Sequence, residues 1–243
     1  LNYSLSWNEK NTTLNLGYAH NSDSVRDDKF VWEDKTTDNF LVGLTQLLSP
    51  NSYLTFNFVF NNDSGYLSDP YRGVMALNNY LQYNPADPAL LPEVRPRHRS
   101  SEVAYIAYTR FFDPLNGSLE TSYRFFHDSW DIYSHTVTLD WHQKIGKHLV
   151  VTPTFRYTWQ SAAFFYYELV PDYQQLPTYY SSDYRLSQMQ TFTFGVSLTW
   201  RVSKWVSLDA SYYRYELEGL DGVTSQSAYP AANVGSIGLR IWF

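Results

Sequence analysis

Cysteine is absent from all 243 residues of the sequence. Disulfide bonds, thiolate nucleophiles, zinc–thiolate sites and covalently attached c-type haem are therefore excluded within these residues. Long apolar runs are also missing: no stretch of about 18 apolar residues occurs, so the sequence offers no transmembrane helix. Basic residues are few, with 18 Lys and Arg against 24 Asp and Glu, and the net charge of −6 argues against nucleic acid as a partner.

Aromatic residues are abundant, at 19% of the chain, and they include 22 Tyr, 15 Phe and 8 Trp. The mean hydropathy is nevertheless −0.41, so the chain is polar on average. The two values together are typical of a membrane β-barrel, in which only alternate residues of each strand face lipid.

Apolar and polar residues alternate in eleven segments, with the period of two of a β-strand. The segment 191–200 is the clearest, because Phe, Val, Leu and Trp alternate there with Thr, Gly and Ser. We predict strands near 1–7, 13–18, 38–48, 54–61, 101–112, 119–125, 136–142, 149–159, 191–200, 206–212 and 235–243.

The predicted connections alternate between short and long along the chain. The short ones fall near 9–10, 49–51, 113–117, 144–147 and 201–204. The long series falls near 21–37, 61–100, 127–131, 161–185 and 216–232. Bacterial outer-membrane barrels show this asymmetry, with short periplasmic turns and long external loops. We therefore predict an all-β fold, an antiparallel transmembrane β-barrel in the bacterial outer membrane.

The last segment, 235–243, alternates in the same way and ends on Phe243. This pattern is typical of the closing strand that the barrel-assembly machinery recognises, so we expect that machinery as a partner. Eleven strands is an odd number, whereas single-chain bacterial barrels have even numbers. We expect residues 1–243 to form one barrel that lacks its N-terminal strand or strands, with at least 12 strands, or about 14–16, in the complete protein.

The facing of the segment 101–112 is ambiguous. Two sets of residues compete for lipid: Val103, Tyr105 and Ala107, or Ala104, Ile106 and Tyr108. We prefer the first set as lipid-facing, because it sends Glu102 and Arg110 inward. Arg110 then lies nearly opposite Glu120 across the turn 113–117, where the two can form an ion pair.

Charged residues of both signs occupy inward positions of the predicted strands. The predicted lumen-lining charges are Arg110, Glu120, Arg124, Asp140, Arg156, Asp209 and Arg240. They can form a charged constriction that filters solutes, or a set of ion pairs that fills a narrow lumen. The balance of signs favours the ion pairs.

Aromatic residues recur near the predicted strand ends, as in the girdles that mark the headgroup level of a membrane. The predicted girdle residues are Trp141, Trp159, Trp200, Trp205, Trp242 and Phe243. Strict alternation would turn Trp242 inward. We expect outer-membrane lipid and lipopolysaccharide as partners of the outer surface.

Two long loops, 61–100 and 161–185, carry the residues expected to make external contacts. These residues are Tyr66, Asp69, Tyr71, Arg97, Tyr173 and Tyr179. The second loop is rich in tyrosine, which favours contact with protein or glycan, unless it folds into the lumen as a plug. The basic cluster 95–99 can bind lipopolysaccharide phosphates or form a solvated loop base. The oxygen-rich start of the first loop lacks the spacing of a calcium site, so no metal is predicted.

Histidines are scattered, and no Ser and His share a lipid-facing position on adjacent predicted strands, as an outer-membrane phospholipase requires. His20, His98 and His127 are expected towards the outside, and a close Asp–His pair among the loops would favour a surface hydrolase. We predict no enzymatic activity and no cofactor.

The stretch Gly65-Tyr-Leu-Ser-Asp-Pro-Tyr-Arg72, together with the closing strand, resembles an outer-membrane barrel family catalogued only as a domain of unknown function. The resemblance spans the chain from about residue 38 to Phe243. It implies a protein longer than this chain and a partner-binding role in envelope redox traffic, with envelope lipoproteins or a surface protein as partners. It supplies no catalytic residues.

Three functions are compatible with these predictions. The first is an outer-membrane pore or conduit that passes small solutes or sheathes a partner protein. The alternative is a structural or docking barrel whose external loops bind another surface protein or a glycan. The third is a surface hydrolase.

Overall fold

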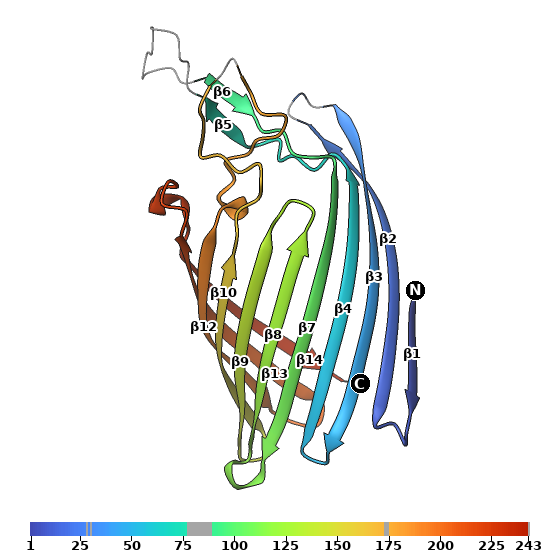
Figure 1. Ribbon diagram of the computed structural model, residues 1–243. Coiled ribbons are helices and arrows are strands. Elements are labelled where there is room, and N and C mark those ends of the chain that lie inside the picture. Colours follow the sequence, from blue (N-terminus) through green and yellow to red (C-terminus); the bar gives the residue numbers. More distant parts are fainter. Residues whose placement is uncertain (28, 30, 77–88, 173–174, 243) are drawn as a thin grey trace.

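Long antiparallel strands form the curved wall of the molecule in the computed structural model (Figure 1). The structure describes residues 1–242 except 28, 30, 77–88 and 173–174. The wall strands are β1 (Asn2–Trp7), β2 (Thr12–Arg26), β3 (Trp32–Ser49), β4 (Ser52–Gly65), β7 (His98–Phe112), β8 (Gly117–Asp128), β9 (Tyr133–Ile145), β10 (Leu149–Gln160), β12 (Met189–Arg201), β13 (Val206–Gly219) and β14 (Ala232–Ile241).

The eleven predicted strands are confirmed as one antiparallel sheet within the described part of the chain. Its spatial order is β1-β2-β3-β4-β7-β8-β9-β10-β12-β13-β14, so β1 and β14 are its two edges and the described sheet does not close between them. No helix among the described residues is long and apolar enough to cross a membrane. The helices described are three short 3-10 turns, η1 (Asp113–Leu115), η2 (Tyr184–Leu186) and η3 (Gln226–Ala228).

The short connections gather at one end of the wall and the long ones at the other (Figure 1). Sequence chemistry explains the tight turns. Asn8, Glu9 and Lys10 all adopt positive φ between β1 and β2, and Asn116 does so after η1. We call the tight-turn end periplasmic, as in other outer-membrane barrels.

The loop predicted at 21–37 is wrong. Strands β2 and β3 continue their ladder to the pair Arg26 and Trp32, whose side chains form a cation–π contact at 4.6 Å. The alternation of apolar and polar residues ends here because both strands extend beyond the apolar part of the convex face. Backbone pairing does not need that alternation and therefore continues beyond it.

The predicted facing of β7 is also wrong. Paired residues share a face in an antiparallel sheet, and β7 pairs Tyr105 with Arg124 and Arg110 with Leu119. Val103, Tyr105 and Ala107 therefore face inward, and Glu102 and Arg110 face outward. Arg110 is not a lumen residue, and the predicted ion pair with Glu120 does not form.

The other predicted wall faces agree with the register. Outward positions carry large apolar side chains that remain exposed, such as Phe194 at 50% and Leu198 at 39%. Inward positions carry small hydroxyl side chains, as in the pairs Thr152–Ser197 and Thr158–Thr191. The wall thus has an apolar convex face and a polar concave face.

Three further strands, which the sequence did not indicate, pair above the wall. They are β5 (Gly73–Ala76), β6 (Ala89–Pro92) and β11 (Leu169–Val170), and they form a small separate sheet in the order β11-β5-β6. We define the loop cap as the described residues of 66–97 and 161–188. In Figure 1 it lies at the long-loop end, above β8 to β10.

The loop cap has a hydrophobic core of its own. One cluster joins Trp130 and Ile132, from the tip of the β8–β9 hairpin, to Ala163, Phe165 and Leu186. A second cluster joins the two loops through Val74, Ala76, Val170 and Tyr180. The aromatic residues of the second loop are therefore largely used inside the cap.

Candidate functional site: the charged wall of the lumen

The concave side of β8, β9 and β10 forms rungs of three laterally paired side chains. From the cap towards the periplasmic turns, the rungs are Arg124–Thr136–Thr158, Ser122–Thr138–Arg156, Glu120–Asp140–Thr154 and Ser118–His142–Thr152. The two arginines thus lie on adjacent upper rungs, and the two carboxylates lie together on the rung below.

Arg124 and Arg156 are neighbours without a carboxylate. They pair with Thr136 and Thr138, two residues apart on β9, so they lie on one face, one rung apart and on either side of β9. Arg156 Nε donates to Thr138 Oγ1 at 3.2 Å, and the Arg124 guanidinium lies 5.5 Å from the Phe126 ring centre. Neither forms a salt bridge within 4.0 Å in the described part of the chain.

Glu120 and Asp140 are direct cross-strand partners of like charge. Such a pair is destabilising unless other groups share the charge. Glu120 accepts from Thr109 at 3.2 Å and from Tyr105 at 3.4 Å, and Asp140 accepts from Thr154 at 2.5 Å. Hydroxyl groups therefore stabilise this rung, and within the described part of the chain no guanidinium forms a salt bridge to it.

Asp209 and Arg240 form the ion pair that the balance of signs predicted for the lumen. Arg240 Nη2 lies 2.6 Å from Asp209 Oδ1, and its Nε lies 2.8 Å from Oδ2. Six of the seven predicted lumen charges therefore lie on the concave face, and Arg110 does not. Only one pair among these six follows the ion-pair hypothesis.

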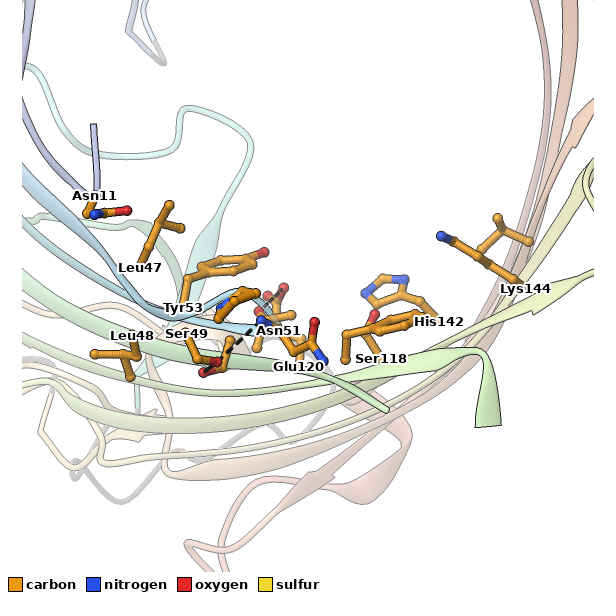
Figure 2. A pocket seen from close by; sticks show the side chains of 15 residues that line it. Asn11, Leu47, Leu48, Ser49, Asn51, Tyr53, Ser118, Glu120, His142 and Lys144 are labelled. Carbon is orange, nitrogen blue, oxygen red and sulfur yellow. Dashed lines mark hydrogen bonds between the residues drawn. The ribbon is translucent and has the colours of Figure 1, made fainter. Parts of the chain in front are cut away.

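A cavity of about 690 Å³ opens at the periplasmic end of the same face. Figure 2 shows Tyr53, Glu120, His142 and Lys144 standing out from the wall around its open space. The His142 Nδ1 lies 3.0 Å from Thr152 Oγ1, which holds the ring against the wall. Polar side chains therefore line this end of the lumen together with apolar ones such as Leu47 and Phe111.

The loop cap contains an ionic cluster that the sequence analysis missed. Its members are Asp69, Arg72, Glu93, Arg95, Asp183 and Arg185. The stretch 65–72 that carried the family resemblance thus supplies two of the six charges. Residues from β6 to β7 and from the second loop supply the others.

Asp183 is the centre of this cluster, and its side chain is 1% exposed. It accepts from Arg95 Nη2 at 2.9 Å and from Arg185 Nε at 2.8 Å, and Arg72 Nη2 lies 3.7 Å away. Burial pushes the pKa of Asp183 upward, but the hydrogen bonds from Arg185 and the charge of Arg72 outweigh burial and lower the pKa. The same hydrogen bond raises the pKa of Arg185.

Glu93 joins the two loops at the other side of the cluster. Its buried carboxylate accepts from Ser181 Oγ at 2.5 Å and from the Asp69 backbone N–H, and it lies 2.7 Å from Arg95 Nε. Breaking a buried pair leaves an uncompensated charge, at a cost of about 3–5 kcal/mol. The cluster therefore fixes the two loops to each other.

The cap lies on the luminal side of the wall. Gln160, an inward residue of β10, donates through Nε2 to the carbonyls of Arg185 at 2.8 Å and Ser187 at 3.0 Å. A pocket of about 390 Å³ separates cap from wall at this point. Its lining combines cap and wall residues: Arg95, Arg99, Arg124, Phe126, Ile132, Ser134, Gln160, Asp183, Arg185 and Leu186.

The predicted loop contacts have different environments. Tyr71 is 95% exposed, Asp69 belongs to the ionic cluster, and Arg97 Nη2 lies 2.7 Å from Glu33. Tyr179 packs against the cap core, and the backbone N–H of Tyr66 donates to Asp34. Tyr173 lies outside the described residues. External contact by any of them stays a prediction.

The predicted girdle residues lie at strand ends. The register puts Trp141, Trp159 and Trp200 on the convex face, beside Leu119, His135 and Leu149. The backbone N–H of Trp242 donates to Trp205, so these two lie side by side across the last ladder. Phe243 lies outside the described residues. Contact of this set with headgroups stays a prediction.

Four histidine pairs occur on the convex face towards the long-loop end. In two of them His127 Nδ1 lies 3.6 Å from Glu102 Oε2 and His135 Nδ1 lies 2.7 Å from the Tyr123 hydroxyl. His20 Nδ1 lies 2.8 Å from Asp38, which also accepts from Tyr18, and His98 Nδ1 lies 3.0 Å from Ser64 Oγ. Among the described residues, no serine contacts His20 and no carboxylate lies within 4.0 Å of His98. Neither of these last two pairs is a complete triad, and the described residues contain no group of ligands that could hold a metal.

Several solved structures share this fold. OmpT, an outer membrane protein of Vibrio cholerae, gives a TM-score of 0.57 at 10% identity, covering 100% of this chain and 63% of its own. The monoaromatic hydrocarbon channel TodX, as a mutant, gives the same TM-score and identity over 100% of this chain and 72% of its own. The siderophore receptor PirA from Pseudomonas aeruginosa gives 0.51 at 12% identity, covering 98% and 42%. This chain therefore spans less than two thirds of OmpT and PirA.

The fold and these likenesses define the protein as an outer-membrane β-barrel of bacteria. The chain belongs to the family described as "Protein of unknown function (DUF3570)", whose model matches residues 27–233. The predicted class, location and family resemblance are therefore confirmed. No curated protein matches the chain in sequence.

Proposed function

We propose that the protein is an outer-membrane pore for small polar solutes. The observation that carries the proposal is the concave face of β8 to β10. It is lined by hydroxyl groups and by charges that mostly lack ion-pair partners, so that it remains hydrophilic. If side chains filled the lumen, we would expect its arginines to form ion pairs with its carboxylates, as Asp209 and Arg240 do.

The cavities support a continuous route along this face. One lies at the periplasmic end and contains Glu120, and the other lies under the loop cap and contains Arg124. Glu120 and Arg124 are separated by four residues on β8, which is about 13 Å of strand. Among structures with this fold, TodX is a channel, which is compatible with conduction here.

Single-channel conductance of the full-length protein in a planar bilayer tests the proposal. We expect a steady conductance that scales with salt concentration. Because the loop cap occupies the luminal side of the mouth, the conductance should be small for a barrel of this size. Protein that is folded by the heat-modifiability criterion and never conducts would overturn the proposal.

A docking role is the second candidate, and the exposed residues of the cap favour it. Tyr71 is 95% exposed and Phe164 50% exposed, although Phe165 and Tyr180 of the second loop are buried. Cross-linking from each position in intact cells would identify a surface partner. Lipopolysaccharide, envelope lipoproteins and the barrel-assembly machinery remain part of our proposal as partners.

We also propose that the barrel is not a hydrolase. The pair His20–Asp38 is what a hydrolase would need, but it has no nucleophile among the described residues. Purified protein should not cleave phospholipid or chromogenic esters. Cleavage of either substrate by purified protein would overturn the proposal. Loss of that cleavage in both His20→Gln and Ser64→Ala would show that the two pairs act together.

A further inference from the structure

We propose that the pocket under the loop cap binds a small organic anion through Arg124 and Arg156. The ligand class is a phosphate or carboxylate on a compact body. This inference deepens the proposed pore and relies on it for the route of the ligand. Binding itself does not require conduction, so the two proposals can fail separately.

The charge around the pocket is unbalanced. Four arginines line it, namely Arg95, Arg99, Arg124 and Arg185, and Asp183 is the carboxylate among its lining residues. Arg95, Arg99 and Arg185 each form an ion pair with a carboxylate. Arg124 has no carboxylate partner in the described structure, and neither has Arg156, which lies one rung further towards the periplasmic turns.

The other arginines of the pocket already have carboxylate partners. Arg99 pairs with Asp128 at 2.5 Å, and its guanidinium stacks 4.4 Å from the ring centre of Trp130. Arg95 and Arg185 both bind Asp183. The contacts of Arg99 fix the upper end of the wall, and those of Arg95 and Arg185 fix the loop cap, so an incoming anion meets the free donors of Arg124 and Arg156.

The wall arginines are arranged to hold one anion. They lie on adjacent rungs of one face, and Arg156 is held by Thr138 through Nε alone. Its two terminal nitrogens and the Arg124 fork remain available in the described contacts. Arginine forks bind phosphate and carboxylate with paired, charge-assisted hydrogen bonds. Arg124 lines the pocket, and Arg156 lies one rung below it across β9, so both forks face the same region of the lumen.

The remaining lining limits the size and position of the ligand. The pocket volume of about 390 Å³ fits a small metabolite, and Phe126, Ile132 and Leu186 supply apolar contact for its body. Glu120 and Asp140 lie on the rung below Arg156 and repel a second anionic group. An anion entering under the cap would therefore stop at the arginine rungs.

Binding of glucose 6-phosphate to the full-length protein in detergent tests the site, with glucose as the uncharged control. Isothermal titration should detect glucose 6-phosphate and not glucose. Arg124→Gln with Arg156→Gln should weaken binding by at least about 10-fold, because each removes charge-assisted hydrogen bonds. Arg110→Gln is the matched control, since it removes the same charge from the convex face and should leave the affinity unchanged.

Each outcome is decisive for one proposal. Wild type that binds glucose 6-phosphate no better than glucose, or a double variant that binds like wild type, overturns the anion site. Binding without conductance supports the site and removes the pore. Conductance without binding supports the pore and removes the site. If the double variant fails the heat-modifiability test, Arg156→Gln alone replaces it and should still weaken binding.

Discussion

The wall and the loop cap of this barrel are stabilised in opposite ways. On the wall, large apolar side chains such as Phe194 and Leu198 point away from the protein and stay exposed. In the cap, Phe165, Val74 and Val170 are at most 1% exposed. Phe165 packs in one hydrophobic cluster, and Val74 and Val170 pack together in the other. The wall thus relies on lipid and its hydrogen-bond ladder, whereas the cap has the core of a water-soluble protein.

The difference assigns different tasks to similar residues. Aromatic side chains such as Phe194 lie exposed on the convex face of the wall, whereas Phe165 and Tyr180 of the second loop pack inside the cap. The arginines of β8 and β10 differ from those of the cap in a similar way. Arg124 on the wall is free to meet a solute, whereas Arg95 in the cap is bound to Glu93 and Asp183.

Phe165→Ala should give the largest difference in stability between the loop cap and the wall. Phe165 is 1% exposed and packs edge-to-face on Trp130 at 5.1 Å, so its truncation should destabilise the cap by about 3–5 kcal/mol. Limited proteolysis should then cut the cap while the heat-modifiable barrel band persists. Phe164→Ala is the control, because Phe164 is 50% exposed and should matter little. Equal loss of the barrel band would mean that wall and cap fold as one unit.

A neighbouring pair on β12 should show the opposite dependence. Val196→Arg places a charge on the lipid face near mid-strand and should cost about 2–4 kcal/mol of folding free energy in lipid vesicles. Ser197→Arg places the same charge in the lumen and should be tolerated. Urea titration of folding measures both. Similar costs for the two, or a larger cost for Ser197→Arg, would contradict the assigned faces.

The sequence predicted the wall because period-two alternation is a local signal. It failed on β7, where both faces are apolar: Val103 and Ala107 face inward as readily as Ala104 and Ile106 would. Pairing with the neighbouring strands β4 and β8 decides between them, through pairs such as Phe56 with Ile106 and contacts such as Tyr105 with Glu120. Arg110 was predicted to face inward for the same reason, because the facing of β7 could not be read from its own residues.

The cap could not be predicted from local patterns. Its central contacts join residues far apart in the chain, such as Glu93 with Ser181, which are separated by 88 positions. Asp69 and Arg72 stood in a recognisable stretch, but their partners Asp183 and Arg185 had no signal of their own. The lumen charges were found as a set, whereas their pairing required the register of β8 to β10.

Acid should open the cap before it affects the wall, and this effect is the smallest of the three. The pKa of Asp183 is lowered in the folded cap, so its contribution is present above the unfolded pKa of about 3.9 and is lost as pH falls through the folded value. Resistance of the cap to acid-stable proteases should therefore be constant from about pH 8 to pH 5 and decline below about pH 4. Asp183→Asn should weaken the cap at neutral pH and reduce this decline. A transition near pH 6.5 would instead implicate a histidine and contradict the role given to Asp183.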